Sequence, residues 1–438
     1  MEKPNNNFYG VVEGFYGRPW GTEGRLGMIT FLGDLGLDLY VYGPKDDPYH
    51  TGKWAEFYPK KEKDDFKTLL ATAKKSNVKF YWAIHLGSAF KSSDDYRAGK
   101  EKVFAKLEDM YQIGFRCFAI FFDDFGNADP EMHTAICNEV VSEFLMKKKD
   151  CAPLIVCPNI YHGDGANRYN RYLGEHVDKS VMLVWTGQKC CCDIDPEYLK
   201  KATENYKRPP LLWWNWPVND YSRENLIIGR LYGLPSKDFS GIMLNPMENC
   251  EASKIAVSSF SKWVKDSINF DSQKAWEDSI KELYPEPIAS SMLVFARHNS
   301  GTGPDRECYQ KLESEGISDF KQAFLDLLKA CETLKEKLPA QNKQLFWELE
   351  GWIDASYYLS KIGLLAEELP TATPEEKRAL LQKIAALEEE KKVKGEEAKK
   401  RFSDATFSGD KDRCVAPKSG TEVLRPHINA LIEKAWAE

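Results

Sequence analysis

The sequence has few of the residues from which metal sites are usually built. It contains only seven histidines, none in an HxxxH or HExxH pattern, which argues against a histidine-based zinc site. The eleven cysteines show no zinc-type spacing, and the consecutive run at 190–192 suits neither ordinary disulfides nor a tetrahedral metal site. We therefore interpret the cysteines as free thiols in a reducing compartment, and we predict no metal and no cofactor.

Long apolar runs and an excess of positive charge are also absent. No window reaches the roughly 18 apolar residues that a membrane-spanning helix needs, and residues 1–7 lack the apolar core of a signal peptide. The 60 Lys and Arg residues are outnumbered by 67 Asp and Glu, whereas nucleic-acid-binding proteins are usually basic. We predict a protein that binds neither membranes nor nucleic acid, and that is either cytoplasmic or secreted with its signal already removed.

Eight short runs of β-branched and aromatic residues occupy the first two-thirds of the chain. Several are almost wholly apolar, as strands buried on both faces should be. The runs are Phe8–Gly14, Leu37–Lys45, Val78–His85, Arg116–Asp124, Leu154–Tyr161, Val181–Gly187, Leu211–Trp216 and Gly241–Pro246. Helical patterns separate them, including Lys63–Ser76, Lys100–Gln112, Pro130–Lys147 and Asp195–Tyr206. This alternation predicts an α/β fold with parallel strands, closed into a (β/α)8 TIM barrel over residues 1–270.

The pattern changes after about residue 270, where strand-like runs end. Long stretches with apolar residues at helical spacing follow, at Ser318–Leu338, Lys343–Leu365 and Pro374–Phe402. Residues 407–420 read as a loop, and a last helix is expected at about 420–437. We predict a second domain at 271–438, an all-α helical bundle with a solvated outer face.

Polar and aromatic residues follow nearly every predicted strand, where barrel enzymes place their active sites. Asp123 and Asp124 come directly after the apolar end of the fourth strand. Two close carboxylates repel one another, so one is expected to keep its proton near neutral pH, giving the acid and anion pair that cleaves glycosidic bonds. A hard-cation site and a helix N-cap are the alternative interpretations of this pair.

Several further strand-end residues offer the flat faces and amide or carboxylate groups that suit a sugar ring. They are Tyr161, Trp185, Trp213, Asn215, Asp220 and Asn245. Strand alternation puts Trp213 and Asn215 on one face, which we assign to the site, and Trp214 and Trp216 on the other, which we assign to packing.

Three lone cationic or titratable residues have two interpretations each. His85 is either a site residue or a structural histidine, and His133, in a helical stretch, is expected to be a packing or surface residue. Lys45 either belongs to the site or pairs with its acidic neighbours on the surface.

Seven motifs in order give the chain a resemblance to a known family. They are Gly10–Gly17, Pro44–His50, Phe122–Asp124, Trp185–Gly187, Trp213–Asn215, Asn219–Tyr221 and Asn245–Met247. The chain resembles glycoside hydrolase family 84, the β-N-acetylglucosaminidases that include protein O-GlcNAcases, and most of all its bacterial members. The resemblance is strong over residues 8–270 and weak in the helical region.

The resemblance implies a retaining mechanism in which the substrate's acetamido oxygen attacks the anomeric carbon and forms an oxazoline. It implies that Asp123 orients the acetamide N–H and that Asp124 acts as acid and then as base. Tyr161 would hydrogen-bond near the reacting centre. The implied sugar-binding residues are Gly10 (through its backbone), Lys45, Trp213, Asn215, Asp220 and Asn245.

Departures from the family pattern lie on the rim of the barrel and bear on which group the protein accepts as the aglycone, the group attached to the sugar. Gly43 stands where alanine is common, and Gln188 follows Trp-Thr-Gly where proline is usual. The implied function is removal of terminal N-acetylglucosamine from Ser or Thr of glycoproteins, or from glycans. The alternatives are a catalytically silent glycan-binding or scaffold protein, and a helical region that acts as a dimer or peptide-docking surface.

Overall fold

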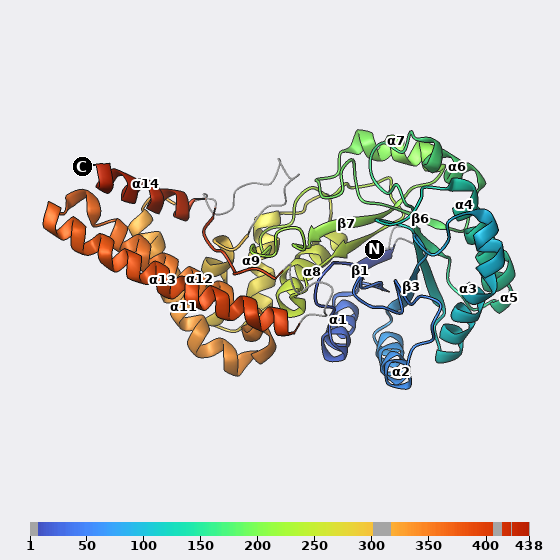
Figure 1. Ribbon diagram of the computed structural model, residues 1–438, viewed down its shortest axis with the longest axis horizontal. Coiled ribbons are helices and arrows are strands. Elements are labelled where there is room, and N and C mark those ends of the chain that lie inside the picture. The colour runs from blue at the N-terminus through green and yellow to red at the C-terminus, as the bar shows by residue number, and fades with distance from the viewer. Residues whose placement is uncertain (1–7, 301–316, 406–413, 422, 438) are drawn as a thin grey trace. The chain divides into compact units, whose positions relative to one another are not determined.

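The structure, a computed structural model, describes residues 8–300, 317–405, 414–421 and 423–437 (Figure 1). These residues form two compact units, which are described separately. The first contains residues 8–218 and 233–248, and the second contains 219–232, 249–300 and the described residues from 317 onward. The domain boundary near residue 270 stays a prediction. Within the described ranges, no helix has the length and apolar character needed to cross a bilayer.

Eight parallel strands close into a barrel in the first unit, which confirms the predicted fold class. Each strand pairs with the next along the chain, and β1 pairs with β8. The strands are β1 (Phe8–Glu13), β2 (Leu39–Tyr42), β3 (Lys79–His85), β4 (Cys117–Phe121), β5 (Ile155–Cys157), β6 (Met182–Trp185), β7 (Leu211–Pro217) and β8 (Gly241–Asn245). Several end before the predicted runs do, so many of the polar residues lie in loops that follow the strands.

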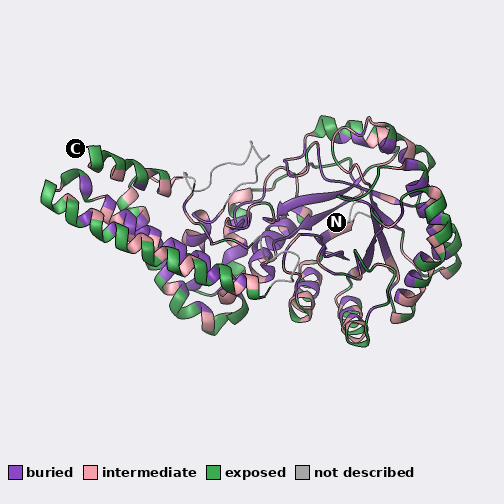
Figure 2. Ribbon diagram, viewed as in Figure 1, coloured by how far each residue is buried: buried purple, intermediate pink, exposed green. Residues whose placement is uncertain are grey.

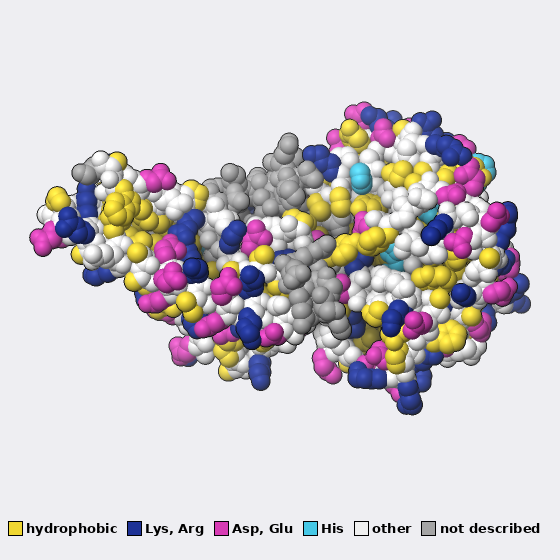
Figure 3. Space-filling model, viewed as in Figure 1, with side chains coloured by type: hydrophobic (Ala, Val, Ile, Leu, Met, Phe, Trp, Pro, Cys, Tyr) yellow, Lys and Arg dark blue, Asp and Glu magenta, His cyan; other side chains and the backbone are white. Residues whose placement is uncertain are grey.

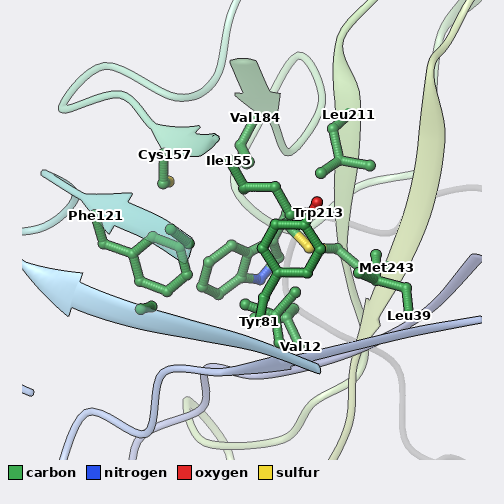
Figure 4. Close-up of a cluster of buried hydrophobic side chains, with 13 residues drawn as sticks. Val12, Leu39, Tyr81, Phe121, Ile155, Cys157, Val184, Leu211, Trp213 and Met243 are labelled. Atoms are coloured by element: carbon green, nitrogen blue, oxygen red, sulfur yellow. The ribbon is translucent and has the colours of Figure 1, made fainter. Parts of the chain in front are cut away.

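The barrel strands are buried on both faces (Figure 2), as parallel strands covered by helices must be. Inside the barrel, side chains from all eight strands form one apolar cluster, in which Trp213 and Phe121 contribute neighbouring rings (Figure 4). The flanking helices are α1 (Thr22–Leu35), α2 (Lys60–Lys75), α3 (Ser93–Ile113), α4 (Pro130–Glu139), α5 (Met146–Lys148), α6 (Arg168–His176) and α7 (Pro196–Tyr206). A π-helical segment, η1 (Val140–Leu145), interrupts the helix predicted at 130–147.

The second unit is helical, as the sequence predicts. Its elements are α8 (Cys250–Lys265), α9 (Ser272–Leu283), α10 (Ile288–Arg297), α11 (Phe320–Gln341), α12 (Lys343–Ala366), η3 (Leu369–Thr371), α13 (Pro374–Asp404) and α14 (Leu424–Ala437). A capping box between Thr373 and Glu376 begins α13. Of the predicted loop at 407–420, residues 414–420 lack helix and strand, and the rest lie outside the described residues. Acidic and basic side chains are interspersed on the visible surface (Figure 3).

Candidate active site

The two adjacent carboxylates lie in the turn that follows β4, at the carboxyl end of the barrel. Asp124 has a φ of 64°, in the left-handed region, so the chain turns sharply between the two residues. The Asp123 residue is only 4% exposed, whereas the Asp124 side chain is 26% exposed. Neighbours in sequence therefore occupy different environments, one enclosed and one open to solvent.

The Lys45 ammonium, which follows β2, contacts both carboxylates. Its Nζ donates to Asp123 Oδ2 and lies 3.5 Å from Asp124 Oδ2, and the Lys45 side chain is buried. Burial opposes its charge, but the two carboxylates outweigh burial and raise the pKa of Lys45 above its ordinary value. Lys45 therefore belongs to the carboxylate cluster and not to a surface pair. Among the described residues, no three His, Cys, Asp or Glu side chains gather as metal ligands.

Two tyrosine hydroxyls donate to Asp124, one to each carboxylate oxygen. The Tyr16 hydroxyl lies 2.8 Å from Oδ2, and the Tyr161 hydroxyl lies 2.8 Å from Oδ1. Burial raises the pKa of Asp124, but the Lys45 charge and these hydrogen bonds outweigh it, so the pKa falls below its usual value. The expectation that repulsion would hold a proton on one carboxyl is therefore not met at Asp124, because a cation stands beside the pair.

Asp123 has one carboxylate oxygen that is hydrogen-bonded and one that is not. Oδ1 is buried and accepts no hydrogen bond from any described residue, and His85 Nε2 lies 3.6 Å from it. His85 holds the backbone of Asp123, because its Nε2–H donates to the Asp123 backbone oxygen at 2.8 Å. Burial and the nearby Lys45 outweigh the Asp123 carboxylate and lower the pKa of His85, which favours the neutral ring. His85 is thus a buried residue that positions Asp123. The His133 ring stacks on the Phe122 ring with centroids 3.8 Å apart, so His133 serves packing.

The amide and indole groups predicted to bind sugar form a hydrogen-bonded set at the ends of β7 and β8. Asn215 Oδ1 accepts from Trp213 Nε1 and from Asn245 Nδ2, each at 2.9 Å. The Trp214 and Trp216 rings contact each other with centroids 5.3 Å apart and planes tilted by 31°, and of the three indoles only that of Trp213 belongs to the cluster inside the barrel, in agreement with the predicted alternation. The buried Oδ1 of Asn245 has no hydrogen-bond partner among the described residues. Trp213, Asn215 and Asn245 are thus brought together in the barrel unit.

Gly10 lies within β1, where it pairs with Leu39 of β2 and Met243 of β8, three residues before the strand ends. A Cβ at this position would lie 1.7 Å from the Leu39 carbonyl oxygen, so glycine allows close strand packing here. Its role in binding sugar through its backbone stays a prediction. Gly14 directly follows β1, and an added Cβ there would lie 2.3 Å from the Trp213 ring.

We expect Gly14→Ala to lower kcat/KM roughly tenfold or more, because overpacking against the indole costs about 1–3 kcal/mol and moves Trp213. Gly52→Ala is the matched control, since a Cβ there meets nothing within 4 Å. Steady-state kinetics on an aryl N-acetylglucosaminide, with melting temperatures of both variants, tests this. Full activity of Gly14→Ala would mean that close packing of Gly14 on Trp213 is not needed to position that ring for activity.

Two residues in the cluster were not predicted from the sequence. Tyr16, from the loop after β1, contacts Asp124, and Cys190 accepts a hydrogen bond from Asn215 Nδ2 at its backbone oxygen, 2.8 Å away. The Cys190 sulfur also lies 3.9 Å from the Tyr161 hydroxyl. The signal for Tyr16 was its place directly after the first strand. Asp220 belongs to residues 219–232 of the second unit, so its sugar-binding role stays a prediction.

The loop that presents Tyr16 is held at several points. The buried Glu13 carboxylate accepts from the backbone N–H of Trp20 at 3.1 Å and from Arg25 at 2.8 and 2.9 Å. Asp46, next to Lys45, accepts from the Gly17 N–H at 3.1 Å. These contacts fix the Tyr16 backbone relative to β1 and to the Lys45 loop, so both groups approach Asp124 from fixed positions.

Comparison with known proteins identifies a matching family. Residues 9–297, well over half of the chain, match the family model of beta-N-acetylglucosaminidase. The Protein O-GlcNAcases of Rattus norvegicus and Mus musculus are each 31% identical over 277 residues, which is 59% of this chain and only 30% of each relative. The chain therefore spans less than a third of the length of these relatives.

Solved structures resemble the chain over nearly its whole length. CpGH84D has a TM-score of 0.81 at 26% identity, covering 98% of this chain and 75% of that one. CpGH84B has a TM-score of 0.79 at 27% identity, covering 97% and 76%. A mutant of the Thermobaculum terrenum O-GlcNAc hydrolase has a TM-score of 0.76 at 23% identity, covering 98% and 94%, and this likeness concerns the fold alone.

Proposed function

This chain belongs to the β-N-acetylglucosaminidase family of glycoside hydrolases, and we propose that it is a retaining, exo-acting enzyme of that kind. Its substrates would be terminal β-linked N-acetylglucosamine on Ser or Thr of glycoproteins, or on glycans. The observation that carries the proposal is a pair of carboxylates that Lys45 contacts together. Asp123 is enclosed, and one of its oxygens accepts no hydrogen bond from the described residues, whereas Asp124 is open to solvent and held by two tyrosines.

In the first step, the acetamido carbonyl oxygen of the substrate attacks the anomeric carbon. Asp123 Oδ1, which accepts no hydrogen bond from the described residues, would accept one from the acetamide N–H and stabilise the positive charge that develops there. The bond from the anomeric carbon to the leaving oxygen breaks, and Asp124 gives that oxygen its proton. The product of this step is an oxazoline in its protonated, oxazolinium form, whose N–H stays hydrogen-bonded to Asp123, and no enzyme nucleophile is consumed.

In the second step, water adds to the anomeric carbon and the oxazoline ring opens. Asp124, now a carboxylate, takes the proton from the attacking water, which returns the site to its starting state. Tyr161, with its hydroxyl on Asp124 Oδ1, would hold that carboxylate toward the reacting centre. The sugar ring and its hydroxyls would contact Trp213, Asn215 and Asn245. A bound sugar would also bury Asp124 further, and burial raises the pKa of this carboxyl, which favours the protonated acid that the first step needs.

We expect Tyr16→Phe to shift the alkaline limb of kcat/KM to higher pH by up to about one unit. The Tyr16 hydrogen bond stabilises the charged form of Asp124, so its loss raises the pKa of Asp124 and keeps the acid protonated to higher pH. The measurement is the pH–rate profile with a substrate whose leaving group needs a proton. A shift to lower pH would contradict the assignment of Asp124 as the acid.

The experiment that tests the proposed function compares a fluorogenic aryl β-N-acetylglucosaminide with the corresponding β-glucoside, which lacks the acetamide. We expect cleavage of the first alone, because the acetamide supplies the nucleophile. Cleavage of both would contradict the substrate-assisted mechanism. Cleavage of neither would favour the glycan-binding protein over the enzyme.

A further inference from the structure

Phe125, the residue directly after Asp124, exposes a large aromatic side chain at the barrel mouth. It is 46% exposed, and the residues that follow it on the rim, at 126–128, are small and also exposed. A single exposed aromatic residue needs no function by itself. Its position beside the predicted acid, and the way its backbone is held, distinguish it from other surface aromatics.

The Phe125 backbone is held from both sides. Its N–H donates to the backbone carbonyl oxygen of Asp123 at 2.8 Å, and its own carbonyl oxygen accepts from Asn159 Nδ2 at 3.0 Å. Gly126 has a φ of 80° and packs so closely that a Cβ would lie 1.5 Å from the Gly87 oxygen. The ring itself contacts the His85 ring edge-on, with centroids 5.5 Å apart. An aromatic ring held in this way loses little freedom when a ligand packs on it.

Geometry places the leaving group near the turn that carries this ring. Adjacent Cα atoms are about 3.8 Å apart, and the oxygen protonated by Asp124 must come within about 3 Å of its carboxylate. The group attached to that oxygen therefore passes close to the turn that carries Phe125. We propose that Phe125 is a specificity-determining residue that packs against the aglycone, and that this aglycone is a second sugar ring. The inference rests on the proposed function.

A sugar ring fits this surface better than a peptide. A pyranose presents a face of C–H groups to an aromatic ring and its hydroxyls to water, so one exposed ring bordered by small residues suffices. An extended peptide would instead need a strand edge or an apolar groove. The eight-stranded sheet of the barrel is closed and offers no strand edge.

The test compares Phe125→Ala with the wild-type chain on two substrates, N-acetylglucosaminyl-β-1,4-N-acetylglucosamine and a peptide carrying N-acetylglucosamine on serine. Phe57→Ala, which removes a 53% exposed phenylalanine from the loop before α2, is the matched control. We expect Phe125→Ala to lower kcat/KM for the disaccharide about three- to tenfold, mainly through KM. Hydrolysis of the peptide should fall by a smaller factor, because a peptide has no pyranose face to pack on the ring. Inhibition by free N-acetylglucosamine and the Phe57→Ala kinetics should stay unchanged.

The other outcomes separate the possible failures. A loss of activity on the peptide alone would mean that the aglycone at Phe125 is a peptide and not a second sugar ring. Equal losses on both substrates, with weaker inhibition by N-acetylglucosamine, would mean that Phe125 only supports His85 and Asp123. Unchanged kinetics in an active enzyme would overturn the inference alone. A wild-type chain that hydrolyses neither these substrates nor the aryl glycoside would overturn the proposed function as well.

Discussion

The Asp124→Asn variant is expected to lose about a thousandfold in kcat/KM on substrates with a basic leaving group, such as a serine-linked sugar. The loss on an aryl glycoside with an acidic phenol should be about tenfold or less at the first step. General acid catalysis contributes roughly 10²–10⁴-fold, and it matters only where the departing oxygen needs a proton. Asparagine keeps the shape of Asp124, and its one amide oxygen still accepts from a tyrosine hydroxyl, but it cannot give up a proton.

The measurement is a series of aryl N-acetylglucosaminides with leaving groups of rising pKa, compared for the wild-type and variant chains. A steep dependence on leaving-group pKa in the variant, and a shallow one in the wild type, is the expected pattern. Azide, which needs no general base, should restore the second step. Glu131→Gln is the control, because it changes an exposed carboxylate of α4 that pairs with Arg168 of α6. Equal losses across the series would remove Asp124 from the acid role.

The barrel was predictable because its signals are local. Eight apolar runs separated by helical patterns specify parallel pairing, and strand alternation alone separates Trp213 and Asn215 from Trp214 and Trp216. The rule that barrel sites lie after the strands also found the two carboxylates and Lys45. Each of these inferences needs only the period of a strand and the place where it ends.

Other features depend on contacts between distant segments and could not be predicted from the sequence. Gly10 and Gly14 lie four residues apart, and only the structure shows that a Cβ at Gly10 would meet the backbone of β2 and that one at Gly14 would meet the Trp213 ring. The lowered pKa of Asp124 depends on Lys45, 79 residues earlier, and on tyrosines from two other loops. Repulsion between the carboxylates was a sound local argument, but it omitted the cation that the fold places between them.

Asp123→Asn is expected to lower kcat about a hundred- to a thousandfold on serine-linked and aryl substrates alike. In the proposed mechanism, the Asp123 charge stabilises the developing oxazolinium whatever group departs, and the variant removes this charge. Asp124 stays 3.5 Å from Lys45, so the buried ammonium keeps a charged partner and the variant should fold. The two aspartate variants should therefore differ in how their losses depend on the leaving group.

Single-turnover and steady-state kinetics of Asp123→Asn on both substrates, with its melting temperature beside that of the wild-type chain, test this expectation. A uniform loss at a near-native melting temperature would assign Asp123 to the acetamide step, which is common to all substrates. A loss that grows with leaving-group pKa would exchange the roles of the two carboxylates. Near-normal turnover on both substrates would contradict acetamide participation, because the developing positive charge would then have no anion enclosed beside it.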